Sequence, residues 1–398
     1  MGRGRASILV AVVALTGCAG LRPATTSEPG PATVERRAPQ TAPASRNGIW
    51  ISPATLRQLP TTGAAWDRLL ADAEADPVTA DVADQDSGQD VATLAAALVC
   101  ARTNSPQLCD KARAGVVSAI GTERGGRWLA VGRNLTAYVI AADVMGLRAD
   151  GDPESAGTRV ETWIRGFETE RLADNNTGEP IPVIPFASGS NASAQEGAAY
   201  VAVAAYLGDR AALERAWDAF RTYLCDPSAP DRERIDLHRG VEAGWAYDDR
   251  HPCAVDPAGA AKRVPPGRPG AGQLVQLDGA IINDMARGGD LAWPPGTTQY
   301  PWVGLEGLVP AAVMLDRAGY PALTVADGAV LRAVRYLRDL ELSTGSGTWF
   351  RERRCNEIIQ LVNVAYGVHF SVDLPAGGGR TVGYTDWTHA TWDAAPAG

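Results

Sequence analysis

The sequence predicts an all-α protein, an incomplete α/α toroid of stacked helical hairpins with long functional loops. Apolar residues recur at helical spacing over most of the 398 residues. No stretch of alternating apolar and polar residues is long enough to organise a sheet, and the lack of a strict repeat period favours a toroid over an open solenoid. With 45% hydrophobic and 21% charged residues, the chain can bury a core and is not a disordered protein.

Residues 1–17 are typical of a secretory signal peptide. Two arginines precede an apolar run over 6–15, which is too short to span a bilayer. The run ends in a Leu-Thr-Gly-Cys motif that resembles the lipobox of bacterial lipoproteins, in which Cys18 would carry the lipid and anchor the protein to a membrane. An ordinary signal with a chance cysteine is the alternative. Both interpretations predict export, as a cell-membrane lipoprotein or as an extracellular or periplasmic protein.

Residues 18–47 contain mainly Pro, Ala, Thr, Ser and Glu and almost no large apolar side chain. Such a composition cannot offset the entropy lost on ordering, so we expect a flexible tether. Residues 48–398 would then form the folded domain, and we expect it to be a monomer.

Five cysteines remain if Cys18 is lipidated, and an exported protein can form disulfides. Cys100 and Cys109 flank a helix break and could clamp a helical hairpin. Cys225 with Cys253 is the next most natural pair, which leaves Cys355 as a buried thiol. The sequence alone leaves the other pairings open.

The helices of the folded domain are predicted from apolar residues at positions i, i+3, i+4 and i+7. In chain order, the predicted segments are 91–98, 105–120, 133–147, 157–172, 192–207, 210–224, 300–318 and 330–340. Gly208 and Gly319 mark helix ends, because glycine readily adopts the left-handed cap conformation.

Three stretches interrupt this helical rhythm: 173–190, 225–278 and 376–398. The second stretch contains His238, Trp245, Tyr247 and His251. Long loops in a compact domain are usually functional or disordered. We therefore expect an ordered loop on the functional face.

The charge balance argues against a nucleic-acid partner. Lys and Arg total 37 against 46 for Asp and Glu, a formal net charge of -9, which supplies no basic face for phosphates. Four histidines also argue against a large metal centre, and we expect neither a metal nor an organic cofactor. Arg124, Arg127 and Arg133 could line a cleft, although a solvated helix end is the simpler interpretation.

The segment 284–302 concentrates polar and aromatic side chains beside a predicted helix start. They are Asp284, Arg287, Asp290, Trp293, Tyr300 and Trp302. Arg can bind a carboxylate through two parallel hydrogen bonds, Tyr can transfer a proton beside a cation, and Trp faces suit sugar rings. Arg287 and Tyr300 are thirteen residues apart and can meet only if the loop between them folds back. In the alternative interpretation, Arg287 bridges a helix end and the tryptophans are core.

Two shorter motifs add candidate residues. Asn191 opens a predicted helix, where it is either a functional amide or simply the N-cap. The segment 383–389 gathers Asp386, Trp387 and His389, which form either part of a site or a structural corner.

Five motifs, taken in order, resemble the alginate-lyase-like polysaccharide lyase family of exported bacterial proteins. They are Gly-Ile-Trp-Ile-Ser at 48–52, Gly-Arg-Asn-Leu at 132–135 with Tyr-Val-Ile-Ala-Ala-Asp at 138–143, the segment 284–302, Leu-Val-Asn at 361–363 with Tyr-Gly at 366–367, and Asp-Trp-Thr-His at 386–389. The resemblance covers about residues 48–390. It implies an α/α toroid that cleaves an anionic, uronic-acid-containing polysaccharide by β-elimination, without a metal or cofactor.

The resemblance also implies roles for individual residues. Asn191 and Arg287 would neutralise the uronate carboxylate, and Tyr300 would act as acid and also as base. Gln195 stands where the family carries a histidine, so His389 or another loop histidine is an alternative base. Substrate-binding candidates are Gln195, Trp245, Asp284, Trp293, Trp302 and Trp387.

Two other functions remain open from the sequence. Because Gln195 cannot accept a proton, the chain could be an inactive lyase-like module that binds anionic glycan at the cell surface. A glycoside hydrolase on the same toroid would instead need a carboxylate pair drawn from Asp284, Glu196 and Asp386.

Overall fold

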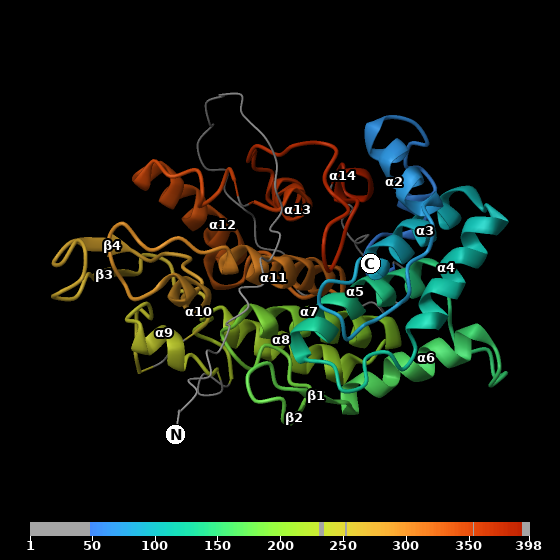
Figure 1. Ribbon diagram of the computed structural model, residues 1–398, viewed down its shortest axis with the longest axis horizontal. Helices are drawn as coiled ribbons and strands as arrows, with labels where there is room; N and C mark the ends of the chain where they lie inside the picture. The colour runs from blue at the N-terminus through green and yellow to red at the C-terminus, as the bar shows by residue number, and fades with distance from the viewer. Residues whose placement is uncertain (1–47, 231–234, 251–252, 353, 392–398) are drawn as a thin grey trace, which may run out of the picture.

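Helices organise the structure: they make up 51% of the computed structural model, and strands only 5%. The structure describes residues 48–230, 235–250, 253–352 and 354–391 (Figure 1). The predicted signal peptide and tether, Cys18 and His251 lie outside these residues. The prediction of a mainly helical protein is confirmed.

The elements follow one another along the chain as a long series of helices interrupted by two small hairpins. They are α1 (Pro53–Leu56), α2 (Ala64–Glu74), α3 (Gln89–Thr103), α4 (Pro106–Ala119), α5 (Trp128–Val144), α6 (Ala156–Gly166), η2 (Phe167–Thr169), β1 (Arg171–Ala173), β2 (Pro180–Pro182), α7 (Asn191–Leu207), α8 (Arg210–Tyr223), α9 (His238–Glu242), β3 (Ala261–Arg263), β4 (Leu274–Gln276), α10 (Ile282–Met285), η4 (Ala286–Gly288), α11 (Tyr300–Arg317), α12 (Val325–Thr344), α13 (Asn356–Tyr366) and α14 (Thr385–Thr388). Strands β1 and β2 pair antiparallel, and so do β3 and β4.

The helices pack as a sequence of neighbours. Helix α3 packs on α5, α5 on α7, α7 on α11 and α11 on α13, while α4, α8 and α12 contact α3, α7 and α11 respectively. Helix α14 contacts both α13 and α2, and α2 packs on α3. Figure 1 shows α7 and α11 running side by side through the middle of the molecule, with the β3–β4 hairpin at one end and α4 and α6 at the other.

Helix α7 lies at the centre of this packing and is buried on every side from Asn191 to Tyr206. Two glycines allow its neighbours to come this close. A Cβ atom on Gly132 of α5 would lie 2.5 Å from the Glu196 nitrogen, and one on Gly307 of α11 would lie 2.4 Å from the Ala194 carbonyl carbon. The backbones of α5 and α11 therefore touch that of α7 directly.

Most predicted helix ends are close to the observed ones, with one correction. The predicted helix over 157–172 is too long, because α6 ends at Gly166 and the chain then turns into η2 and β1. Residues 326–328, within α12, have left-handed φ values of 51–68°, so its regular part begins at Ala329. Helices α2 and α13 were not predicted.

The N-cap of α7 also differs from the simplest sequence interpretation. Ser190 is the cap, and its side chain accepts a hydrogen bond from Ser193 N. Asn191 is the first residue of the helix. Its amide is therefore not needed for capping.

The structure contains the two predicted disulfides, Cys100–Cys109 and Cys225–Cys253, and Cys355 is a buried thiol outside them. The Cα atoms of the pairs are 4.8 Å and 5.3 Å apart, ordinary separations for disulfides. The first bridge joins α3 to α4 across their short connection. Two disulfides indicate an oxidising, exported environment. Among the described residues, no helix is both long and apolar enough to cross a bilayer.

Candidate active site

Four predicted site residues, Asn191, Asp284, Arg287 and Tyr300, come together where α7 and α11 begin; we call them the Asp284 cluster. Asp284 Oδ1 accepts hydrogen bonds from the backbone nitrogen of Asn191 at 3.2 Å and from its side-chain nitrogen, Nδ2, at 2.8 Å. The guanidinium carbon of Arg287 lies 4.8 Å from the centre of the Tyr300 ring. The loop between Arg287 and Tyr300 therefore folds back and brings the two side chains into contact.

Asp284 is fully buried, and its second oxygen, Oδ2, has no hydrogen-bond partner among the described residues. A Cβ atom on Gly304 of α11 would lie 2.6 Å from Oδ2, so a glycine is needed there to leave room for the carboxyl group. Burial raises the pKa of Asp284 to about 7, against the opposing effects of the Asn191 hydrogen bonds and the Arg287 charge. This carboxyl group can therefore change its charge near neutral pH.

Arg287 is exposed, and within the described ranges no carboxylate forms an ion pair with it. Its guanidinium group lies over the face of the half-buried Tyr300 ring. A guanidinium group held on an aromatic face keeps its N–H donors available for an anion. Arg287 and Tyr300 thus present a cation and a phenol side by side at the edge of the cluster.

One helical turn beyond Asn191, Gln195 connects three helices. Its Nε2 donates to Val303 O at 3.0 Å and to Glu306 Oε2 at 3.4 Å, both on α11. Its Oε1 accepts from Arg133 Nε of α5 at 3.0 Å. Gln195 is fully buried, so the structure does not present it to a substrate as predicted. It holds α5, α7 and α11 together beneath the cluster.

Arg133 is likewise an internal residue rather than part of a cleft wall or a solvated helix end. It is 2% exposed, also donates to Gln85 O at 3.0 Å, and burial lowers its pKa. The Cys355 thiol donates to Glu306 Oε1 at 3.2 Å. This network was not predicted from the sequence. The signal for it was an arginine among the mainly apolar residues of 128–142, since a charge in that position needs an internal partner.

Three predicted stacking residues, Trp245, Trp302 and Trp387, are buried to 1–2% exposure. Each indole N–H donates to a backbone carbonyl; the acceptors are Gly289, Trp349 and Pro60, at 2.8, 3.0 and 2.8 Å. Because both the ring faces and the N–H groups are used inside the protein, these residues are core rather than sugar platforms. Trp293 is half-buried and lines a pocket.

The structure places His389 in the core. It is 1% exposed, packs edge to face on Trp50 with ring centres 4.8 Å apart, and its Nδ1 lies 2.9 Å from Thr388 Oγ1. The two residues before Trp50 contact the carboxyl ends of α5 and α11. The Ile49 nitrogen donates to Asp143, and Arg317 donates to the Gly48 carbonyl. Tyr300 begins α11. None of these contacts brings His389 to the Asp284 cluster.

The carboxylates proposed for a hydrolase do not form a pair with Asp284 in the contacts that the structure gives them. Glu196 is 1% exposed, neither of its oxygens has a partner among the described residues, and burial raises its pKa well above the usual value. Asp386 accepts hydrogen bonds from Arg68 and from the Ala376 nitrogen, both at 2.9 Å. Asp386 is thus engaged in holding the C-terminal segment to α2.

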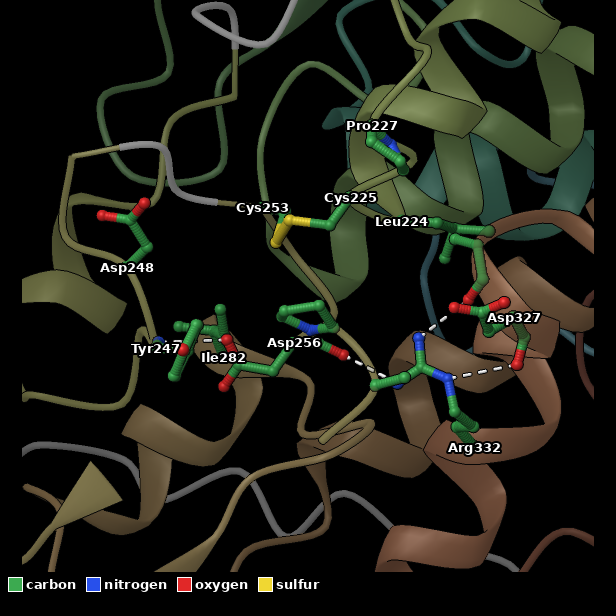
Figure 2. A pocket seen from close by; sticks show the side chains of 13 residues that line it. Leu224, Cys225, Pro227, Tyr247, Asp248, Cys253, Asp256, Ile282, Asp327 and Arg332 are labelled. Carbon is green, nitrogen blue, oxygen red and sulfur yellow. Dashed lines mark hydrogen bonds between the residues drawn. A yellow bond between two sulfur atoms is a disulfide. The ribbon is translucent and has the colours of Figure 1, made fainter. Parts of the chain in front are cut away.

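A pocket of about 340 Å³ lies beside the Cys225–Cys253 disulfide (Figure 2). Its lining includes Tyr247, which is 49% exposed, and Asp256, whose Oδ1 accepts from the Tyr247 nitrogen at 3.0 Å. Asp256 is buried, which raises its pKa to about 8. Figure 2 shows Arg332 reaching the backbone oxygens of Asp256 and Asp327 at its edge. This pocket contains none of the predicted catalytic residues.

A larger pocket of about 530 Å³ lies between the β3–β4 hairpin and α12, and Trp293 is part of its lining. Comparison with known proteins gives no matching family model and no match among curated proteins. The resemblance to polysaccharide lyases therefore rests on the sequence motifs.

Proposed function

We propose that this chain is an exported polysaccharide lyase that cleaves a uronic-acid-containing polysaccharide by β-elimination. The observation that carries the proposal is the contact of Arg287 with Tyr300 beside the hydrogen-bonded pair Asn191 and Asp284. Elimination needs a cation and an amide to neutralise the uronate carboxylate, and a nearby group to move protons. The Asp284 cluster offers these groups within one small region.

In the proposed reaction, the exposed Arg287 guanidinium binds the carboxylate of the sugar, and the Asn191 amide, which is only 3% exposed at the start of α7, contributes the one N–H that Asp284 does not hold. Withdrawal of its charge makes the C5 proton removable, and the electron pair left at C5 is delocalised into the carboxylate as an enolate. The C5–C4 double bond then forms as the C4–O glycosidic bond breaks, and the departing oxygen takes a proton. We assign both proton transfers to Tyr300, because Gln195 is locked in the interior and His389 packs on Trp50.

Asp284 has a positioning role in this scheme. An amide has two N–H donors on its nitrogen, and Asp284 accepts from Nδ2 of Asn191. Holding Nδ2 by one N–H orients the other. The charge of the chain as a whole, -9, does not exclude an anionic polymer, since exposed charges beyond about 8–10 Å are screened at physiological salt.

The finer description of the fold and the location belongs to the same proposal. Helices α3, α5, α7, α11 and α13 would form the inner layer of an incomplete α/α toroid, which their successive packing supports. The amino-terminal halves of α5, α7 and α11 carry Arg133, Gln195 and Glu306, and α7 and α11 begin at Asn191 and Tyr300 of the cluster. Lipidation of Cys18 would anchor this domain to a membrane through the tether 18–47, in reach of an extracellular polymer.

The test is ultraviolet absorbance during incubation of the purified protein with alginate, polymannuronate, polyguluronate and hyaluronate. A lyase produces an unsaturated uronate, whose conjugated double bond absorbs. Tyr300→Phe should lower the rate at least a hundredfold, because removal of a proton-transfer group typically costs 10²–10⁴-fold. Tyr247→Phe is the matched control, since Tyr247 is exposed and lies outside the cluster, and it should retain the rate.

The outcomes separate the functions. Full activity of Tyr300→Phe would disprove the mechanism. Saturated products with new reducing ends would indicate a hydrolase, and binding without any product would indicate a glycan-binding module.

A further inference from the structure

The 530 Å³ pocket has the lining of a sugar-binding site, and that lining contains no residue of the Asp284 cluster. It lies between the β3–β4 hairpin and α12, and its size falls within the usual range of about 300–1,000 Å³ for small-ligand pockets. Trp293 forms part of its lining and is half-buried, so part of its ring is accessible, in contrast to the three buried tryptophans. An accessible indole face suits the C–H face of a sugar ring.

The pocket also carries a cation that the protein leaves unused. Arg335 of α12 is exposed and lines the pocket, and among the described residues no carboxylate forms an ion pair with it. Arg332, one turn earlier, is committed: it donates to Asp278 Oδ1 at 2.6 Å and to the carbonyl of Asp256 at 2.9 Å. The two carboxylates of the lining have partners as well. Asp278 accepts a hydrogen bond from Arg332, and Asp339 is also engaged in an interaction within the protein.

The remaining polar groups of the pocket are hydrogen-bonding rather than charged. Gln273 and Gln276 are exposed on the hairpin side. Tyr336 is 5% exposed, and its hydroxyl is buried without a partner among the described residues. The exposed amides beside a guanidinium group can bind the hydroxyl groups and the carboxylate of one ligand.

The pocket and the Asp284 cluster share one segment of the chain. Asp278 and Trp293 line the pocket, while Asp284 and Arg287 lie between them in sequence, on α10 and η4. This segment follows β4 directly and packs on α12, since a Cβ atom on Gly279 would lie 2.4 Å from the Arg332 carbonyl oxygen. One stretch of chain thus contributes to both regions.

We propose that this pocket binds one acidic sugar of the polymer outside the position of cleavage, with Trp293 stacking on the ring and Arg335 binding the carboxylate. The class of ligand rests on the proposed function. The pocket selects a uronate over a neutral sugar through the one uncommitted guanidinium group of its described lining. It would add affinity for the polymer without taking part in the elimination.

The experiment measures binding of alginate and hyaluronate to the full protein by isothermal titration calorimetry, with dextran as a neutral polymer. Arg335→Gln and Trp293→Ala should each weaken binding of at least one uronate polymer about tenfold, the usual effect of losing a charged hydrogen bond or a stacked ring. Arg210→Gln is the control: it removes the same charge from α8, where the Arg210 side chain is 63% exposed and forms an ion pair with Glu214. It should bind as the wild type does.

The readouts keep this proposal distinct from the proposed function. If the wild type cleaves a polymer, Arg335→Gln should raise KM about tenfold with kcat unchanged, whereas Tyr300→Phe should lower kcat. Wild-type KM and affinity in Arg335→Gln would overturn the pocket assignment and leave the lyase intact. Binding without cleavage, lost in Arg335→Gln, would support the pocket and refute the lyase. Equal affinity for dextran, or no binding of either uronate polymer by the wild type, would overturn the assignment.

Discussion

Asp284 illustrates how its surroundings change the chemistry of a single carboxyl group. One oxygen accepts two hydrogen bonds from Asn191, while the other faces Gly304 with no partner among the described residues. Burial without full compensation disfavours the charged form and raises the pKa of Asp284 to about 7. The carboxyl group is close enough to Arg287 for its charge to affect an anion bound there.

At the residue scale, we predict that Asp284→Asn makes substrate binding less sensitive to pH. Above pH 7 the wild-type carboxyl group becomes negative and repels a uronate, so KM for the polymer should rise between pH 6 and pH 8. Asparagine keeps an oxygen for Asn191 but cannot ionise, so its KM should stay nearly constant. Steady-state kinetics at several pH values measure this; the same rise in both proteins would contradict the prediction.

Individual residues show what the sequence could and could not predict. The polar segment 284–302 and the helix start at Asn191 indicated the cluster, because charged and amide side chains beside helix starts were visible as a pattern. Burial was not visible: Trp302 and Trp293 are the same residue type nine positions apart, and only packing makes one core and the other a pocket wall. Gln195 could not be recognised as internal, because its partners Arg133 and Glu306 are remote in sequence.

At the scale of elements, the position of the cluster depends on how closely α7 approaches its neighbours. Gly307 of α11 faces the α7 backbone at Ala194. The next residue of α7, Gln195, donates hydrogen bonds to Val303 and Glu306 of α11. A side chain at position 307 would force α11 away from α7. The hydrogen bonds of Gln195 would then lengthen, and the distance between the first turns of α7 and α11 would increase.

We predict that Gly307→Ala destabilises the protein by about 1–3 kcal/mol, the usual cost of overpacking a core. It should also lower lyase activity, because Tyr300 moves away from Asn191. Gly166→Ala is the matched control, since Gly166 ends α6 and has nothing within 4 Å of a Cβ atom. Chemical denaturation compares the two variants. Equal stability would show that the interface of α7 and α11 can accommodate a methyl group at position 307.

Among the elements, the prediction is most accurate for the helices whose apolar periodicity is strongest. Helices α7, α8 and α11 begin and end within one or two residues of the predicted bounds, because caps and glycines mark their ends. The predicted helix over 157–172 failed at its end, where residues 171–173 pair with 180–182 instead. A strand pairing depends on a partner across a loop, so the periodicity of one segment does not reveal it.

At the scale of the whole molecule, several carboxyl groups share the situation of Asp284. Asp90 and Asp256 are 1% exposed, and burial raises their pKa values to about 7 and about 8. Burial likewise raises the pKa of Glu196 well above its usual value. In the unfolded chain these groups would ionise near their ordinary pKa values, about 4. Between pH 4 and about 7 the folded protein therefore holds more protons than the unfolded chain.

We predict that the free energy of unfolding falls as pH rises from 5 to 8. For each group whose folded pKa lies above its unfolded value, the stability falls between those two pKa values by at most about 1.4 kcal/mol per pH unit. Asp90 and Asp284 act up to about pH 7 and Asp256 up to about pH 8. Carboxyl groups with lowered pKa values, such as Asp174, lose their contribution only below about pH 4, outside this range.

Thermal or chemical unfolding at pH 5, 6.5 and 8 measures this dependence. Asp256→Asn should reduce the loss of stability between pH 7 and pH 8 in particular, because Asp256 is still mostly protonated at pH 7, whereas Asp90 and Asp284 are by then about half ionised. A protein that is equally stable at pH 5 and pH 8 would mean that these interior carboxyl groups find water or a cation in solution. In that case the oxygens of Asp256 and Asp284 that have no partner in the described part of the chain would mark places where a ligand binds.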